Sequence, residues 1–151
     1  MKKFISLIIK FFKKPIKEQL LYIEVIFWLS VTRLVILVLP FKIIARFLGK
    51  HMAESDRNHD LNCMDEVKLV VSSILSMSRH LPWECKCLVQ AISGKMMLGK
   101  RKISNTLYFG VAKDEDRGII AHAWLRVGEV IILGGGGLDQ FAVVSTFSSY
   151  V

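Results

Sequence analysis

Cysteine is scarce in this sequence, whose 151 residues include only Cys63, Cys85 and Cys87. The apolar N-terminus lacks a small-residue cleavage site, so an odd number of cysteines argues against a disulfide framework and for a reducing, cytoplasmic compartment. One residue separates Cys85 from Cys87, whereas zinc ligand pairs need two to four between them, and no second pair completes a site. We therefore expect no disulfide, no metal and no other cofactor.

Acidic residues are also few. The chain has 13 of them against 21 lysines and arginines, which gives a net charge of +8. This excess favours an anionic partner such as a membrane surface, an acidic peptide or a nucleic acid. The sequence contains neither the glycine-flanked aromatic motif nor the Cys/His spacing of nucleic-acid-binding modules, so we expect no nucleic-acid partner.

No uncharged apolar run reaches the roughly 18 residues of a membrane-spanning helix. The stretch from Leu20 to Leu48 is strongly apolar, but Glu24 and Arg33 interrupt it and Pro40 breaks it. We expect it to form a hydrophobic helix that packs against the rest of the protein, against a partner or against a bilayer surface. Peripheral membrane association is therefore one of the alternatives for this segment.

The apolar pattern divides the chain into two segments. Residues 1–58 predict a hydrophobic helical N-terminal segment, with a long helix over residues 17–39 and a shorter helical piece after Pro40. The polar stretch from His51 to Asp60 has no apolar period and predicts a linker. Residues 59–151 have a different pattern and are predicted to form a second domain.

The second domain begins with helices and ends with strands. An apolar stripe at helical spacing predicts a helix from Asn62 that ends at Pro82, and a further helix runs from Glu84 to Leu98 with Gly99 as its stop. Residues rich in β-branched and aromatic side chains then predict strands over 106–112, 119–127, 130–133 and 141–146. A tight turn at Gly128 joins two of them. The predicted fold class is α+β, with helices segregated from an antiparallel sheet.

Cys87 is a candidate nucleophile because it falls in the first turn of the helix that follows Pro82. A thiol there lies among unpaired backbone N–H groups at the positive end of the helix dipole. Both features favour the thiolate, which is the reactive form of cysteine. The same N–H groups can receive the oxyanion that forms when an acyl group is attacked. Cys85 is a rival nucleophile, and Cys63 is predicted to be a core residue.

His122 is the candidate base. It lies on the predicted strand 119–127, where alternation places it on the same face as Trp124. If that face meets the start of the Cys87 helix, the imidazole can take the thiol proton and later return it to a leaving amine. An isolated cysteine or histidine is more often structural, so the residue pattern alone leaves the pairing open.

Three blocks of sequence carry a resemblance to a known family. They are PWECKCLVQA at residues 82–91, LYFGV at residues 107–111 and AHAWL at residues 121–125. In this order and spacing they resemble the transglutaminase-like leader peptidases of lasso-peptide biosynthesis, and the likeness covers residues 60–151. The resemblance implies a transglutaminase-like (papain-like) cysteine protease core with Cys87 as nucleophile and His122 as base. It favours Cys87 over Cys85 because Leu88 and Ala91 follow Cys87 as they follow the family's nucleophile.

The resemblance also implies a substrate and partners. Members of this family hydrolyse the bond between leader and core of a ribosomally made precursor peptide, and a separate ATP-using lasso cyclase then closes the ring. Some members carry a fused leader-recognition domain with its own strands. Residues 1–60 predict helices without such strands, so we expect a stand-alone peptidase that works with a separate leader-binding protein.

One position departs from the family pattern. The family's third catalytic residue is an acid at the start of the strand after the histidine strand, about a dozen residues on. Here that region is IILGGGG, residues 131–137, which contains no acid. Asp139 is the nearest downstream candidate for the orienting acid, while Glu129 belongs to the predicted turn. A backbone carbonyl or another side chain is the alternative.

Two other functions remain open from the sequence. The same fold and residue pair can carry out acyl transfer or deamidation on a different peptide. Alternatively, the chain is a non-catalytic scaffold of a peptide-maturation complex, a reading that the missing acid favours.

Overall fold

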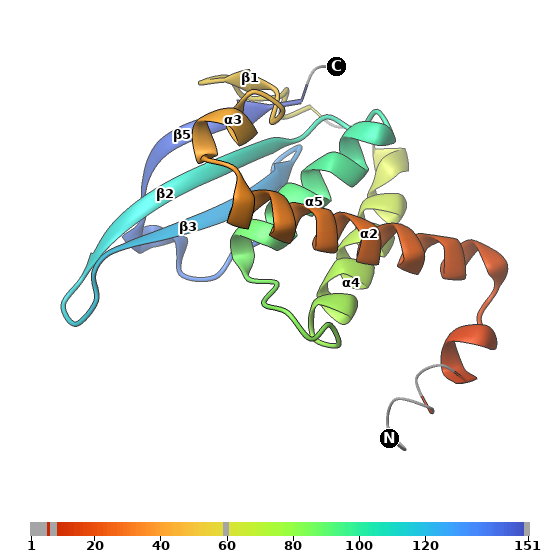
Figure 1. Cartoon of the computed structure of the whole chain (residues 1–151). Coiled ribbons are helices and arrows are strands. Elements are labelled where there is room, and N and C mark those ends of the chain that lie inside the picture. The colour runs from red at the N-terminus through yellow and green to blue at the C-terminus, as the bar shows by residue number, and fades with distance from the viewer. Residues whose placement is uncertain (1–5, 7–8, 59–60, 150–151) are drawn as a thin grey trace.

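A five-stranded antiparallel sheet forms one layer of the molecule, and the helices lie on one of its faces (Figure 1). The computed structural model describes residue 6 and residues 9–58 and 61–149. The strand order is β1-β5-β2-β3-β4, with every neighbouring pair antiparallel. This arrangement confirms the predicted α+β class and the segregation of helices from the sheet.

The predicted elements are found close to their expected positions. The helices are α2 (Ile16–Val38), α3 (Phe41–Ala45), α4 (Met64–Ser78) and α5 (Cys87–Lys100), with short 3-10 turns η1 (Leu61–Cys63) and η2 (Leu138–Gln140). The strands are β1 (Lys50–His51), β2 (Thr106–Asp114), β3 (Gly118–Val127), β4 (Val130–Leu133) and β5 (Ala142–Ser148). The predicted turn at Gly128 is confirmed, because Val127 pairs with Val130 and Gly128 has a φ of 56°.

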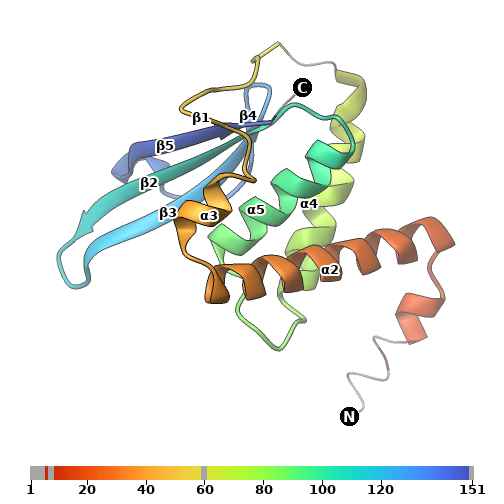
Figure 2. The ribbon, with the colours of Figure 1, turned by 45° about the horizontal axis from the view of Figure 1, so that its top comes forward.

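Helix α2 begins after Pro15 and ends before Pro40, as the fixed φ of proline and its missing N–H group require. Its buried residues recur on one side of the helix and are Leu21, Val25, Leu29 and Thr32. They pack on α4 and α5, and Ser93 of α5 donates a hydrogen bond to Thr32 Oγ1 at 3.1 Å. Figure 2 shows α5 lying between the sheet and α2.

The hydrophobic core is continuous across residue 58. Val25 and Leu29 from the N-terminal segment share one buried cluster with Ile74, Leu107 and Leu125 from the second segment. The boundary near residue 58 therefore marks a change of sequence pattern along the chain. The division into two domains, residues 1–58 and 59–151, stays a prediction.

Several boundaries differ from the predictions; α5, for example, begins at Cys87 and not at Glu84. Gly99 does not stop α5, which continues to Lys100. The left-handed residue that ends it is Lys102, with a φ of 57°, and the N–H of Ile103 returns to the carbonyl of Leu98 at 3.0 Å. The predicted linker over residues 51–60 was also wrong at its start. Lys50 and His51 form β1, which pairs with Ser148 and Phe147. A strand of this length is too short to show an alternating pattern in the sequence. Residues 59–60 of the predicted linker lie outside the described residues.

Candidate active site

Cys87 is the first residue of α5, three residues after the predicted start at Glu84, and so lies in the first turn as expected. Lys86 before it is extended, with a φ of −75° and a ψ of −178°, and its carbonyl accepts the first helical hydrogen bond from Gln90 N at 3.0 Å. No side chain caps this helix end. The N–H groups of the first turn are thus left for water or for a ligand, beside a half-buried thiol.

The other two cysteines lie in settings that suit chemistry less well. Cys85 is 8% exposed, and burial raises the pKa of its thiol, which keeps it protonated. Cys63 ends η1, directly before α4, and packs against the core. Of the two neighbouring candidates, the environment therefore disfavours Cys85 and leaves Cys87.

His122 lies in the middle of β3, and its imidazole is held by a backbone group. The distance from His122 Nε2 to the carbonyl oxygen of Gly134 is 2.7 Å. A carbonyl only accepts hydrogen bonds, so the ring proton lies on Nε2 and donates to it. That tautomer leaves the lone pair of Nδ1 available to take a proton. The ring also stacks on two aromatic rings. The distance between ring centroids is 6.0 Å to Trp124 and 5.1 Å to Phe141.

The face of the sheet that carries His122 is not the face on which α5 packs. Trp124 stacks on Tyr108 of β2 at 5.5 Å, on the His122 side of the sheet. The alternate residues Ala123 and Leu125 belong to the core beneath the helices. A β-carbon on Gly94 of α5 would lie 3.1 Å from Leu125 Cδ2. The predicted alternation is confirmed, and α5 packs on the face opposite to the one that carries His122.

No hydrogen bond joins Cys87 and His122. Cys87 begins the helix that packs on the face of Ala123 and Leu125, whereas His122 lies on the other face of β3. The thiol and the imidazole are therefore not paired in the free chain.

A comparison with known families decides what kind of domain this is. The model of the transglutaminase-like superfamily matches residues 35–146, about three quarters of the chain. The chain belongs to the transglutaminase-like superfamily. Catalysis in this superfamily is typically of the cysteine-protease type. No curated protein and no solved structure matches the chain.

In the transglutaminase-like domain, the backbone carbonyl of Gly134 takes the place of the acid that the resemblance implied. Gly134 follows His122 by twelve residues and comes directly after β4, the strand next to the histidine strand. Its φ is 73°, and a β-carbon there would lie 2.4 Å from the carbonyl oxygen of Ala123. Only glycine fits this position. In the sequence, the feature that points to this carbonyl is the run of glycines after a predicted strand, at the spacing where the acid was expected.

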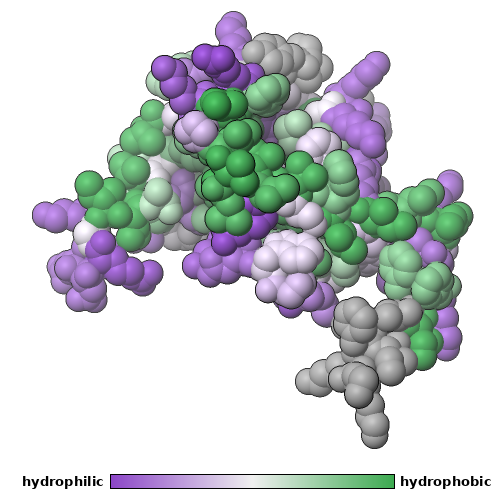
Figure 3. Space-filling view, in the orientation of Figure 1, coloured by the Kyte–Doolittle hydropathy of each residue, from purple (hydrophilic) through white to green (hydrophobic). Residues whose placement is uncertain are grey.

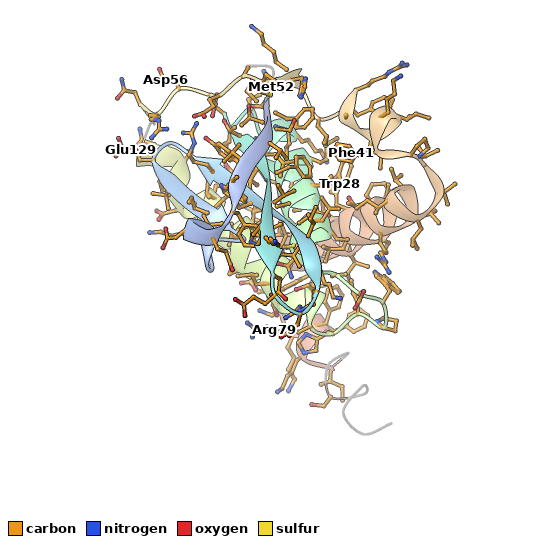
Figure 4. All side chains as sticks on the ribbon, turned by 90° about the vertical axis from the view of Figure 1, so that its left-hand side faces the viewer. Trp28, Phe41, Met52, Asp56, Arg79 and Glu129 are labelled. Carbon is orange, nitrogen blue, oxygen red and sulfur yellow. The ribbon has the colours of Figure 1, made fainter. Side chains whose placement is uncertain are left out.

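The two candidate acids lie elsewhere. Asp139 is exposed in η2 and makes no hydrogen bond or ion pair with His122, so its role as orienting acid stays a prediction. Glu129 lies in the turn between β3 and β4, at the periphery of the molecule (Figure 4). In the described part of the chain, the group that orients the imidazole is thus the Gly134 carbonyl.

A polar cluster that sequence reasoning missed covers the same face of the sheet. Arg126 is 4% exposed, and its guanidinium donates to Tyr108 Oη at 2.8 Å, to Glu54 at 3.2 Å and to the carbonyl of Ser55 at 3.0 Å. Burial raises the pKa of Tyr108. The cluster fixes the loop after β1 over β2 and β3, beside the stacked Trp124. The described residues include no group of three side chains that could hold a metal ion.

Proposed function

We propose that this transglutaminase-like domain is a leader peptidase that hydrolyses the leader–core bond of a ribosomally made lasso-peptide precursor. Cys87 would be the nucleophile and His122 the base. The assignment of roles rests on one observation: the imidazole of His122 is held at Nε2 by Gly134 and has Nδ1 available, while the thiol of Cys87 stands at the first position of a helix. The restriction to a lasso precursor is supported by the sequence blocks around Cys87 and His122.

The proposed chemistry has two halves. His122 Nδ1 accepts the thiol proton of Cys87 as the sulfur attacks the last carbonyl of the leader, and the N–H groups at the start of α5 receive the oxyanion. When the C–N bond breaks, His122 gives its proton to the amine of the core peptide. Water then attacks the leader thioester with His122 again as base, which releases a carboxylic acid and restores the thiol.

This reaction requires a movement, because the two side chains do not touch in the free chain. Catalytic hydrogen bonds are often formed only in the substrate complex. The segment from Arg79 to Lys86, which leads into Cys87, contains no helix or strand and its residues are mostly exposed. We propose that precursor binding between this segment and β3 brings the thiol to Nδ1.

The proposed partners and location follow from the same reaction. The precursor leader would be presented by a separate leader-binding protein, and the released core would pass to a lasso cyclase. A cytoplasmic location suits both steps, since the precursor and the nucleotide that the cyclase uses are made there.

The test is leader release from the precursor in the presence of the leader-binding protein, followed by mass spectrometry. The variant Cys87→Ala should lose activity by a factor of roughly 10³ or more, whereas Cys85→Ala, two residues away and buried, serves as the matched control and should retain most of it. Full activity in Cys87→Ala would remove Cys87 from the mechanism. Product masses also distinguish hydrolysis, which leaves free ends at the junction, from acyl transfer or deamidation.

A non-catalytic scaffold is the second candidate, and the absence of a hydrogen bond between Cys87 and His122 favours it. Iodoacetamide separates the two readings. An activated thiol is alkylated at near-neutral pH, while an ordinary thiol, with a pKa near 8.5, reacts slowly. Alkylation of Cys87 no faster than that of free cysteine would support the scaffold.

A further inference from the structure

Helix α2 has a second apolar face, opposite the face that packs on the core. Its exposed large apolar residues lie on one side of the helix and are Ile16, Leu20, Ile23, Phe27, Leu34, Leu37 and Val38, each between 54% and 68% exposed. After Pro40 the surface continues with Phe41, Ile43 and Phe47. We call these ten residues the outer apolar face. Figure 3 shows apolar side chains gathered over α2 and α3.

Single exposed apolar residues are normal on a protein surface. A continuous apolar patch marks an interaction site, because removing it from water is favourable. Beside it, a hollow of about 220 Å³ lies between α2, α3 and α5, and all of its lining residues except Thr32 are apolar. Among them are Trp28, Leu39 and Phe47. The hollow offers no charged group to a ligand, so what it suits is a hydrocarbon chain.

The segment of the chain that forms this face carries mostly positive charges. Residues 9–50 contain eight basic side chains, namely Lys10, Lys13, Lys14, Lys17, Arg33, Lys42, Arg46 and Lys50, and two acidic ones, Glu18 and Glu24. The balance of 8 − 2 gives +6 out of the chain's +8. Both acids are already paired, Glu18 with Lys14 at 2.7 Å and Glu24 with Arg101 at 2.6 Å. A binding surface with this charge favours an anionic partner.

The inner face of α2 decides how the helix can meet a membrane. By length and composition alone, α2 is the one helix in the described part of the chain that is apolar enough to cross a bilayer. Its inner residues, however, lie in the protein core with those of α4 and α5, and Glu24 is held by Arg101. A spanning α2 would expose that core and break the ion pair. The helix can instead lie in the plane of the interface with its fold intact.

We propose that α2 and α3 dock this protein on the surface of an anionic lipid bilayer. The outer apolar face enters the boundary between headgroups and acyl chains, and the lysines and arginines at both ends of α2 contact the phosphate groups. A second copy of the chain would bring like charges together, which disfavours dimerisation through this face. Lipid docking does not depend on whether Cys87 is catalytic.

The test is cosedimentation of the full chain with vesicles of phosphatidylcholine mixed with phosphatidylglycerol, and with vesicles of phosphatidylcholine alone. We expect binding to the mixed vesicles that weakens as salt is added and is much weaker on neutral vesicles. The double variant Phe27→Glu/Leu34→Glu should lower binding at least tenfold, by roughly the cost of placing two charges at an apolar interface. Its control is Ile119→Glu on β3, which is 82% exposed and lies outside the outer apolar face.

The variant Lys13→Glu/Lys17→Glu leaves the apolar face unchanged and should also reduce binding to anionic vesicles. Circular dichroism checks that each variant is folded. Failure of the unmodified chain to bind anionic vesicles, or equal binding by Phe27→Glu/Leu34→Glu, would overturn the proposal. A dimer that Phe27→Glu/Leu34→Glu dissociates and no other variant does, combined with no binding to vesicles, would also overturn it. So would resistance of the bound protein to extraction by alkaline carbonate, because that resistance indicates a spanning helix.

Discussion

The two faces of the sheet place the two candidate catalytic residues in different environments. The face beneath the helices is a dry core built from Ala123, Leu125 and Leu107, and Cys87 belongs to the helix that covers it. The other face carries His122, Trp124 and Tyr108 in an aromatic row, covered by the loop after β1. The histidine is thus oriented independently of the helix that positions the cysteine.

The same contrast appears in two buried cations. Lys95, under the helices, is 4% exposed and donates only to neutral oxygens of Asn105 and Phe147, so burial lowers its pKa to about 8. Arg126, on the opposite face, is equally buried but reaches the carboxylate of Glu54 at 3.2 Å. The helix-covered face therefore accommodates a cation without a counter-ion, whereas the His122 face supplies one.

On the face that carries His122, the largest effect should come from replacing His122 itself. Replacing it with alanine removes the base, and leader release should fall by a factor of roughly 10² to 10⁴. The residual rate should then rise with pH, because the thiolate of Cys87 must form without a neighbouring base. A rate–pH profile unchanged in shape would show that His122 is structural, and circular dichroism of the variant controls for folding.

On the helix-covered face, the largest cost should follow from truncating Leu125. The variant Leu125→Ala leaves a cavity against Gly94 and Leu133 and should lower the free energy of unfolding by about 2–5 kcal/mol. The control Ile119→Ala, on the same strand but 82% exposed, should change it by less than about 0.5 kcal/mol. Urea denaturation measures both, and similar losses in the two variants would contradict the assigned core.

Gly134 links β4 to the imidazole, and its replacement tests that link. Gly134→Ala places a β-carbon 2.4 Å from the Ala123 carbonyl at a φ of 73°, which should cost about 1–3 kcal/mol of stability. It should also release the His122 ring and lower leader cleavage. Gly136→Ala, where a β-carbon meets nothing within 4 Å, is the matched control. Thermal melts and the NMR shifts of His122 Nε2 report the two effects.

The smallest predicted effect concerns Lys95 and pH. Its pKa is about 8 in the folded chain and 10.5 in the unfolded chain. Between these values the unfolded chain binds more protons, so stability rises as pH increases through 8 and levels off above 10.5. From pH 7 to pH 9 the gain should be about 1 kcal/mol. Lys95→Met should flatten this dependence in urea denaturation, and an unchanged slope would show that another group causes it.

Much of the fold was predictable from local pattern. The helices α2 and α4 have apolar stripes, the strands are rich in β-branched residues, and Gly128 suits a tight turn. Each of these patterns depends on residues only a few positions apart. The sequence also predicted Cys87 at the start of a helix and His122 beside Trp124 on a strand. It missed β1, Lys102 as the residue that ends α5, and the cluster around Arg126, because each depends on partners distant in the chain.

The sequence by itself determined the long helices, the four longer strands, the candidate residues and the likeness to transglutaminase-like proteins, since these follow from residue type and spacing. Only the tertiary structure decided which face of the sheet α5 covers, that the carbonyl of Gly134 holds His122, and that one face of α2 is not covered by the rest of the described chain. The physical reason is that alternation along a strand defines two faces but does not say which one the helices bury. That choice is made by packing of the whole core.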